Sequence, residues 1–410
     1  MKKLQLAVIS DIHVGKGARA KDLCPADEPE RDAMPDEKYM EKFLGFIKTK
    51  SLKADYLILP GDVTHSARPE EVQIASEFIG KACVSLNVNP NNVVFVPGNH
   101  DVDWSVFEKP DSTGVRRAQR YDPIRSNRFD FKAIIERGTG CVFEAPHFTV
   151  WNTPDLLVVG YNSAHHDDPK KFHHGLVDVA HIEEMRQVLS KLPDSKDQLR
   201  LFLVHHHPLQ YDDPTPESPD RSIMVNAEQL QAFVGKFHFD LFVHGHRHLP
   251  RFKTQSLDGS PEVAILCSGS FSVKIDTRWT GTINNQFHLI TVDGRDPVEH
   301  LITGRVESWS YNYVRGWVKS DATHDGIPHV EPFGTYIRPE SLKALLRPIL
   351  EGYFAAGDFV EWSSVLHKEP HLRHLRPEMV LRVLDELATV VNFRRIHDSP
   401  EKIVLLKGMT

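Results

Sequence analysis

Five short clusters of Asp, Asn and His carry the side-chain types that bind metal ions, and each follows an apolar run. They are Asp11-Ile12-His13, Gly61-Asp62, Gly98-Asn99-His100-Asp101, His205-His206-His207-Pro208 and Gly245-His246-Arg247-His248. Carboxylate, amide and imidazole donors without a thiolate suit Mn²⁺, Fe or Zn²⁺ better than they suit a Cys-rich structural zinc site. Seven or so donors exceed the need of one catalytic ion with an open position. The set therefore predicts two ions that share a bridging carboxylate.

The spacing within the clusters supports a common pocket. Alternate residues of an extended segment project to the same side, so Asp11 and His13 can reach one site, as can His246 and His248. Gly61, Gly98 and Gly245 permit tight turns and a close approach of the backbone at the strand ends.

Apolar runs ahead of the clusters predict the strands that position them. Near-continuous apolar runs are typical of strands that are buried on both faces, and they alternate here with segments of helical periodicity. Strand–helix–strand units imply a central sheet covered by helices, and ligands bind beyond the carboxyl ends of such strands. The predicted strands are 4–10, 55–60, 92–97, 156–160, 201–205, 241–244, 263–268 and 287–292, and the predicted helices are 39–47, 69–81, 178–192 and 227–236.

In this order, the five clusters resemble the motifs of the calcineurin-like metallophosphoesterase family. The patterns are DxH, GD, GNHD, a histidine ahead of a proline, and GHxH, and they extend from Asp11 to His248. The resemblance implies an α/β fold, a four-layer αββα sandwich, over residues 1–305. It also implies two bound metal ions, with Mn or Fe favoured over Zn, and a metal-dependent phosphoric ester hydrolase.

The resemblance also implies a role for each motif residue. One ion would be held by Asp11, His13 and His248, and the other by Asn99, His206 and His246, with Asp62 as the bridge. His206 is selected from the three histidines because the family ligand stands two residues before a proline, here Pro208. His100 would meet the phosphate and assist the leaving group, and Asp101 would orient its imidazole. No substrate-binding residue is identified.

The expected reaction is the hydrolysis of a phosphodiester by a hydroxide that bridges the two metals. The motif set looks most like the class III cyclic-nucleotide phosphodiesterase branch of the family, so a cyclic nucleotide or a similar small diester is the leading substrate. The alternatives are a DNA or RNA nuclease that resembles the repair exonucleases, and then a phosphomonoesterase or protein phosphatase. A regulatory scaffold with vestigial catalysis is disfavoured because it has no need of His100.

Composition narrows the choice of partners and compartment. The 410 residues include 49 Lys and Arg against 56 Asp and Glu, a net charge of −7, which argues against nucleic-acid binding by bulk charge. No apolar run approaches the length of a membrane span. Four cysteines without CxxC spacing favour a reduced, cytoplasmic compartment.

The character of the chain changes after residue 305. We expect residues 306–337 to form an irregular linker and residues 338–410 to form a small, mainly helical domain that ends in a hairpin, in a winged-helix-like arrangement. Its slightly acidic balance favours homo-oligomerisation or protein docking over DNA binding. Two polar, proline-containing segments, 15–35 and 208–219, are equally consistent with lids over the site and with ordinary surface loops.

Overall fold

The computed structural model divides the chain into two compact units. The first comprises Met1–Val292 and Val306–His329, and the second comprises Asp293–Arg305 and Val330–Thr410. The structure describes residues 1–108, 119–126, 141–167, 174–193, 197–211, 222–257, 259, 261–275, 283–296, 300–335, 337–396 and 402–408.

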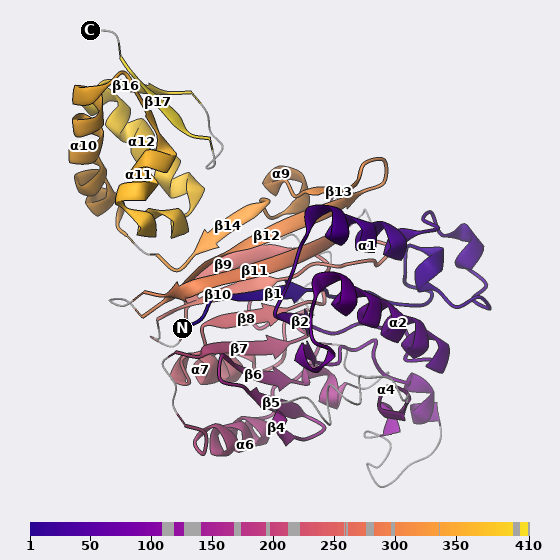
Figure 1. The fold of residues 1–410 in the computed structure, drawn as a ribbon. Coiled ribbons are helices and arrows are strands. Elements are labelled where there is room, and N and C mark those ends of the chain that lie inside the picture. Colours follow the sequence, from indigo (N-terminus) through magenta and orange to yellow (C-terminus); the bar gives the residue numbers. More distant parts are fainter. Residues whose placement is uncertain are drawn as a thin grey trace. The chain divides into compact units, whose positions relative to one another are not determined.

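The first sheet of the first unit carries the amino-terminal strands. Its strand order is β13-β12-β11-β1-β2-β3, with β1, β2 and β3 parallel and β11 antiparallel to β1 (Figure 1). The strands are β1 (Leu4–Val8), β2 (Tyr56–Leu59), β3 (Val93–Phe95), β11 (Gln286–Arg295), β12 (Ile302–Asn312) and β13 (Gly316–Lys319).

The second sheet follows the order β4-β5-β6-β7-β8-β10-β9, and its four central strands are parallel. The strands are β4 (Cys141–Glu144), β5 (Phe148–Asn152), β6 (Leu156–Tyr161), β7 (Leu199–Val204), β8 (Leu241–His244), β9 (Arg251–Ser256) and β10 (Glu262–Cys267).

Helices cover one face of each sheet, as Figure 1 shows. Ala7 and Leu57 of the first sheet pack in one apolar cluster with Phe43 of a covering helix, whereas Phe202 of the second sheet packs with Phe233. Leu6 and Leu201 are equally buried but lie outside these clusters, since alternate strand residues face the other sheet. The result is the predicted four-layer αββα sandwich. Its helices are α1 (Tyr39–Lys50), α2 (Pro69–Leu86), α4 (Asp122–Ser126), α6 (Val179–Leu189), α7 (Ala227–Lys236) and α9 (Ala322–Asp325).

The segment 306–337, which we expected to be an irregular linker, contains regular structure instead. Most of β12, all of β13 and α9 extend the first unit, and β14 (Val330–Phe333) pairs with β12. The alternation of β12 is hard to recognise in the sequence because two of its buried residues, Ser308 and Ser310, are polar. Hydrogen bonding compensates for this burial, since Ser308 Oγ lies 2.8 Å from the Nδ1 atom of His288.

The second unit is a small helical domain with a three-stranded sheet. Leu346, Val365 and Leu384, one from each helix, are buried in its own apolar core. The predicted terminal hairpin is present, because β16 and β17 pair antiparallel, and β15 extends it on the other side of β17. The elements are α10 (Pro339–Ala356), β15 (Phe359–Glu361), α11 (Trp362–Lys368), α12 (Pro377–Val391), β16 (Phe393–Arg395) and β17 (Val404–Lys407).

The polar, proline-containing segment 15–35 is described throughout, and segment 208–219 is described only at its start. Segment 15–35 contains two short 3-10 helices, η1 (Lys21–Leu23) and η2 (Arg31–Ala33), whereas most of segment 208–219 lies outside the described residues. No helix among the described residues combines the length and apolarity needed to cross a membrane.

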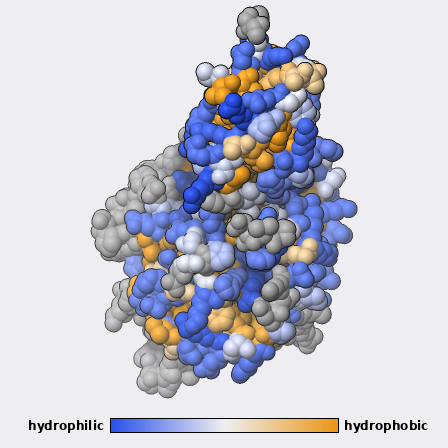
Figure 2. Space-filling view, turned by 90° about the vertical axis from the view of Figure 1, so that its left-hand side faces the viewer, coloured by the Kyte–Doolittle hydropathy of each residue, from blue (hydrophilic) through white to orange (hydrophobic). Residues whose placement is uncertain are grey.

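The face drawn in Figure 2 is largely hydrophilic, with apolar residues in small patches.

Candidate metal centre

The five clusters follow the carboxyl ends of β1, β2, β3, β7 and β8, and backbone hydrogen bonds hold them together. Within the first sheet, the amide of His13 donates to the Asp62 carbonyl at 2.9 Å. Within the second sheet, the amide of Gly245 donates to the His205 carbonyl at 3.0 Å. The amide of His246 donates to the Asp11 carboxylate at 3.1 Å and so joins the two sheets. The predicted convergence of the clusters is therefore present.

Strained backbone is concentrated in these clusters. Of the twelve described non-glycine residues with positive φ, five were predicted as metal ligands. A left-handed conformation is unfavourable for a residue with a Cβ atom and persists only where the surroundings enforce it. This strain points to a functional arrangement of the side chains. The five residues are Asp11 (51°), His13 (51°), Asp62 (51°), His246 (84°) and His248 (60°).

Asp11, His13 and His248 form one group of potential ligand atoms. The Oδ1 atom of Asp11 lies 3.9 Å from His13 Nε2 and 3.4 Å from His248 Nε2. Such separations are close to those between two ligands of one ion with bonds of about 2.0–2.2 Å. The other oxygen of Asp11 accepts a hydrogen bond from Ser10 Oγ at 2.5 Å, which orients the carboxylate.

Asp62 lies between this group and a second one. Its Oδ2 atom is 3.5 Å from His13 Nε2 and 3.2 Å from His205 Nε2, while its Oδ1 atom accepts a hydrogen bond from the His100 amide at 2.8 Å. Asp62, His205 and His246 form the second group of potential ligand atoms. A carboxylate that approaches both groups has the position required of a bridging ligand.

The structure differs from the residue-by-residue expectation at the triple histidine. The resemblance implies His206, whose Nδ1 atom lies 2.7 Å from Ser163 Oγ and whose Nε2 atom is 3.6 Å from Asp167 Oδ2. His205 is instead the residue whose Nε2 atom approaches Asp62, and its Nδ1 atom contacts the Pro60 carbonyl at 2.8 Å. Both rings nevertheless lie near His246, with centroids 4.4 Å away for His206 and 5.1 Å away for His205.

The buried atoms of the site fit a metal. The Oδ1 atom of Asn99 and both ring nitrogens of His13 are buried and have no hydrogen-bond partner among the described residues. Buried polar atoms are rarely left in this state, and an ion at the centre of these donors would satisfy them.

Charge states also suit a cation. Burial and the neighbouring His100 lower the pKa of His13 well below its usual range, and burial with His206 does the same for the pKa of His246. Both rings are therefore neutral, which is the form that binds metals. Burial alone would raise the pKa of Asp62, but His205 and His100 hold it well below its usual range. The centre thus presents an ionised carboxylate beside the neutral imidazoles of His13 and His246, whereas Asp62 raises the pKa of His205 to about 9 against the effect of burial.

His100 borders the site, but its partner is not the expected one. Its Nδ1 atom lies 2.9 Å from the carbonyl oxygen of His65, and its ring centroid is 4.6 Å from that of His13. Asp101, expected to orient this imidazole, instead accepts hydrogen bonds from the Thr64 amide at 2.8 Å and the Gly98 amide at 3.0 Å. Asp101 therefore fixes the loop that carries Asn99 and His100 and does not contact the ring.

Two residues of the site were missed by the sequence analysis. His65 lies within 5.0 Å of His100 between ring centroids and belongs to a group with His13 and His100. Its position three residues after Asp62 was the available signal. Asp167, whose pKa burial raises to about 7, faces His206 from a segment without any recognisable motif.

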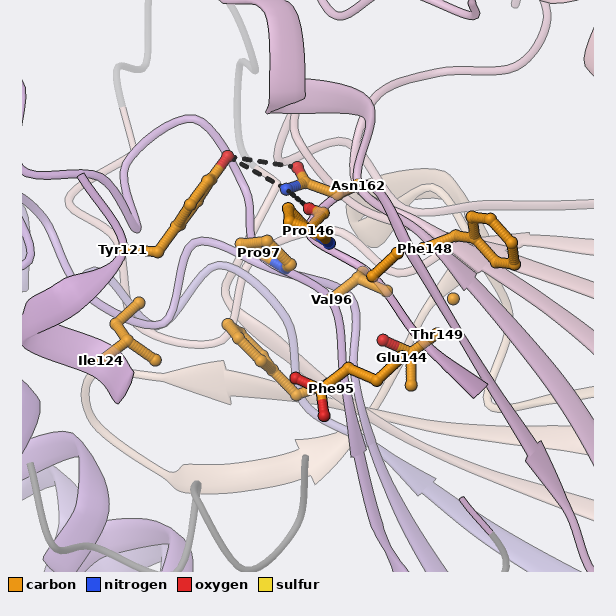
Figure 3. Close-up of a pocket in the computed structure, with 12 residues that line it drawn as sticks. Phe95, Val96, Pro97, Tyr121, Ile124, Glu144, Pro146, Phe148, Thr149 and Asn162 are labelled. Atoms are coloured by element: carbon orange, nitrogen blue, oxygen red, sulfur yellow. Dashed lines mark hydrogen bonds between the residues drawn. The ribbon is translucent and has the colours of Figure 1, made fainter. Parts of the chain in front are cut away.

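A small, largely apolar pocket lies beside the strand that leads to Asn99. Phe95, Val96 and Pro97 line one part of it, and Phe148 and Asn162 line another (Figure 3). The side-chain amide of Asn162 donates to the Tyr121 hydroxyl at 3.0 Å. None of the predicted metal ligands lines this pocket, so it is not part of the metal centre.

Comparison with known proteins is consistent with this geometry. A family model described as calcineurin-like phosphoesterase matches residues 4–250, which include all five clusters. No curated protein sequence matches the chain.

Solved structures give more distant similarities. A purple acid phosphatase from yellow lupin (Lupinus luteus) seeds is 14% identical with a TM-score of 0.45, over 77% of this chain and 52% of that chain, so this chain spans about half the length of that phosphatase. A phosphopantetheinyl hydrolase from Mycobacterium tuberculosis is 15% identical with a TM-score of 0.35, over 65% of this chain and 89% of that chain. A metallophosphoesterase from Sphaerobacter thermophilus is 14% identical with a TM-score of 0.28, over 84% and 94% of the two chains.

The packing around Asp62 predicts a strong effect of one added methyl group. A Cβ atom at Gly98 would lie 2.7 Å from the Asp62 amide nitrogen and would collide with the Asp62 carboxylate. We expect Gly98→Ala to lower the free energy of unfolding by about 1–3 kcal/mol and to reduce the metal content. Gly80→Ala is the matched control, because a Cβ atom there meets nothing within 4 Å in helix α2. It should leave stability unchanged or raise it by about 0.5–1 kcal/mol. Thermal unfolding and metal counting measure both effects, and equal behaviour of the two variants would contradict the prediction.

The two adjacent histidines predict opposite results. His205→Ala removes the donor that faces Asp62, so we expect it to lose one metal ion per chain. His206→Ala removes the ring bound by Ser163 Oγ and should retain both ions. The measurement is the number of metal ions per chain after dialysis. The reverse result would make His206 the ligand, as the family motif implies.

Proposed function

Because this chain belongs to the calcineurin-like phosphoesterase family, we propose that its metal centre hydrolyses phosphodiester bonds, with a cyclic nucleotide or a similar small diester as the substrate. Family membership makes the chain a metal-dependent phosphoric ester hydrolase. The observation that carries the finer proposal is the position of Asp62, whose Oδ2 atom approaches both His13 and His205.

The residues divide into two ligand sets. Asp11, His13 and His248 would hold one ion. Asn99, His246 and one histidine of the pair His205 and His206 would hold the other, with Asp62 between the ions. His205 is preferred within the pair because of its approach to Asp62. Two carboxylates and an amide oxygen among the donors favour Mn or Fe over Zn.

When bound, the two ions would supply Lewis acidity to the phosphoryl oxygens and a nucleophilic water near neutral pH. The side chains themselves position the substrate phosphate and provide a proton for the leaving group. His100 lies next to His13 at the edge of the group, where a substrate phosphate would meet it. The His65 carbonyl accepts from Nδ1 of this ring and therefore directs Nε2 outwards. When both ring nitrogens carry a proton, His100 can donate the proton on Nε2 to the departing alkoxide.

The choice of a small diester over a nucleic acid rests on charge. The net charge of −7 gives no general attraction for a polyanion, and a nuclease is expected to present a basic groove with exposed aromatic residues. A small substrate needs only the ions and a few nearby donors. The nuclease and the phosphomonoesterase therefore remain the second and third candidates.

Two further proposals concern the rest of the chain. No disulfide joins the four cysteines of the chain, which supports a reduced, cytoplasmic location; they are Cys24, Cys83, Cys141 and Cys267.

The small helical unit formed by the last residues of the chain would serve homo-oligomerisation or protein docking, and the metallophosphoesterase domain would act on the substrate.

Replacement of Asp62 and of His100 separates metal binding from proton transfer. Asp62→Asn should lose both ions and all activity, because it removes the charge shared by both ligand groups. His100→Ala should keep its metal content and lose about 10²–10⁴-fold in kcat. The loss should be greatest for a substrate with a poor leaving group. Full activity of His100→Ala on such a substrate would exclude the proton-donor role.

A substrate panel tests the reaction class. With Mn²⁺ supplied, we expect hydrolysis of a bis-aryl phosphate to exceed that of a mono-aryl phosphate, and cyclic nucleotides to be cleaved. The panel also contains single- and double-stranded DNA and RNA, and the Asp62→Asn variant is the control for contaminating activity. If DNA were the only substrate hydrolysed, the small-diester proposal would be wrong and the protein would be a nuclease.

A further inference from the structure

A second group of histidines lies outside the dinuclear centre and takes no part in the proposed reaction. His165 and His166 belong to the 3-10 helix η5 (Ser163–His166), which follows β6, and His181 lies in the first turns of α6. His147 precedes β5 and packs against them. Four imidazoles from three segments of the chain thus meet at one place.

Three of these rings are close enough to share an ion. One nitrogen from each of His165, His166 and His181 lies within 4.8 Å of the others. The rings of His165 and His166 are perpendicular, with centroids 4.9 Å apart, so their nitrogens can approach one point from different directions. Three imidazoles from protein are the ligand set of several Zn²⁺ sites, in which a water or carboxylate completes the tetrahedron.

The hydrogen bonds of Tyr161 determine which nitrogen of His181 carries the lone pair. The Tyr161 hydroxyl donates its single hydrogen to the Leu176 carbonyl at 3.0 Å and accepts from the Asp178 amide at 3.1 Å. His181 Nδ1, at 3.2 Å from the same hydroxyl, must therefore donate to it. The Nε2 atom of His181 is then the unprotonated nitrogen. Metal-binding histidines usually donate a hydrogen bond from the ring nitrogen that does not bind the metal, and the Tyr161 hydroxyl accepts such a bond from Nδ1 of His181.

Asp178 brings a carboxylate oxygen to the same place. As the N-cap of α6, it uses Oδ1 to accept from the Ala180 amide at 2.8 Å. This leaves Oδ2 at 3.3 Å from His166 Nε2 and 3.9 Å from His181 Nε2. Ligands of a tetrahedral ion with bonds of about 2.1 Å are separated by roughly 3.4 Å. The separation from His166 already matches this value, and only the separation from His181 must contract.

His147 supports the group without joining it. Its ring stacks on that of His181, with centroids 4.0 Å apart and an interplanar angle of 20°. Its Nε2 atom lies 2.7 Å from Glu184 Oε2, so this nitrogen is engaged away from the other three rings. The stack holds the His181 ring in its orientation.

Burial and access are both suitable for a metal ion. The Nδ1 atom of His165 is buried and has no hydrogen-bond partner among the described residues. The side chains of His166 and His181 are 23% and 11% exposed, which leaves a path for an ion to enter. Burial, with the neighbouring His166, lowers the pKa of His165 to about 3, and burial with His147 lowers the pKa of His181 to about 4, so both rings are neutral at pH 7.

We propose that His165, His166 and His181, with Asp178 beside them, bind a third metal ion, Zn²⁺ or a similar divalent transition metal. This site is separate from the dinuclear centre and does not depend on the phosphodiesterase reaction. It would tie η5 to the start of α6. Since Ser163 of η5 contacts His206 at 2.7 Å, the ion would also stiffen the wall of the dinuclear centre.

Metal counting tests the proposal. The full-length chain is stripped with a chelator, dialysed against Zn²⁺ and analysed by inductively coupled plasma mass spectrometry. We expect His166→Gln and His181→Gln each to bind one Zn²⁺ fewer per chain than the wild type. His367→Gln, at an exposed position of α11, is the matched control and should bind the wild-type number. Equal zinc content in the wild type and in both cluster variants would overturn the proposal.

Two further measurements distinguish the loss of a metal site from the loss of the fold and from effects on the dinuclear centre. Thermal unfolding of the stripped proteins identifies a variant that has lost its fold, and His166, whose side chain is the more exposed of the two, offers the milder substitution. The same pair of changes is also made in the Asp62→Asn background, where the dinuclear centre is disabled. A loss of one Zn²⁺ there supports the third site whatever the outcome for Asp62, and no loss excludes it.

Discussion

The position of one carboxylate, that of Asp62, is the constraint on which the metal centre depends. Asp62 follows the short strand β2, yet its side chain must reach donors from both sheets of the sandwich. It does so from a left-handed backbone conformation with φ of 51°. The neighbouring glycines make this possible, because a Cβ atom at Gly61 or at Gly98 would overlap the atoms that pack around the carboxylate.

The same constraint explains the polar interior of the site. An ionised carboxylate that is fully buried is costly unless charges or hydrogen bonds compensate it. Here the His100 amide and the imidazole of His205 provide that compensation, and Asp62 in turn raises the pKa of His205 to about 9 against the opposing effect of burial. Without an ion, the carboxylate therefore holds a proton on His205. A cation at this place would displace that proton, so metal binding should release protons.

Much of this could be predicted from the sequence because the signals were local. The strands before the clusters are continuous apolar runs, and the order of the motifs indicated the family and the sandwich. The prediction was weaker where the signal was not local. Ser308 and Ser310 conceal a buried strand because hydrogen bonds, not apolar contacts, compensate their burial. Asp167 joins the site only through folding, and no spacing in the sequence distinguishes it from an ordinary polar residue, whereas His65 is marked only by its position three residues after Asp62.

The triple histidine shows where motif and geometry can diverge. A motif counts residues back from Pro208, whereas the fold counts them forward from the end of β7. Counting back from Pro208 selects His206, whereas the approach to the Asp62 carboxylate selects His205. The ring of His206 lies between the two places, because its centroid is 4.4 Å from that of His246 while its nitrogens face Ser163 and Asp167. His206 then links the dinuclear centre to η5, the helix that also carries His165 and His166. The histidine that the motif selects as a ligand is, in this geometry, the connection between the two histidine-rich sites.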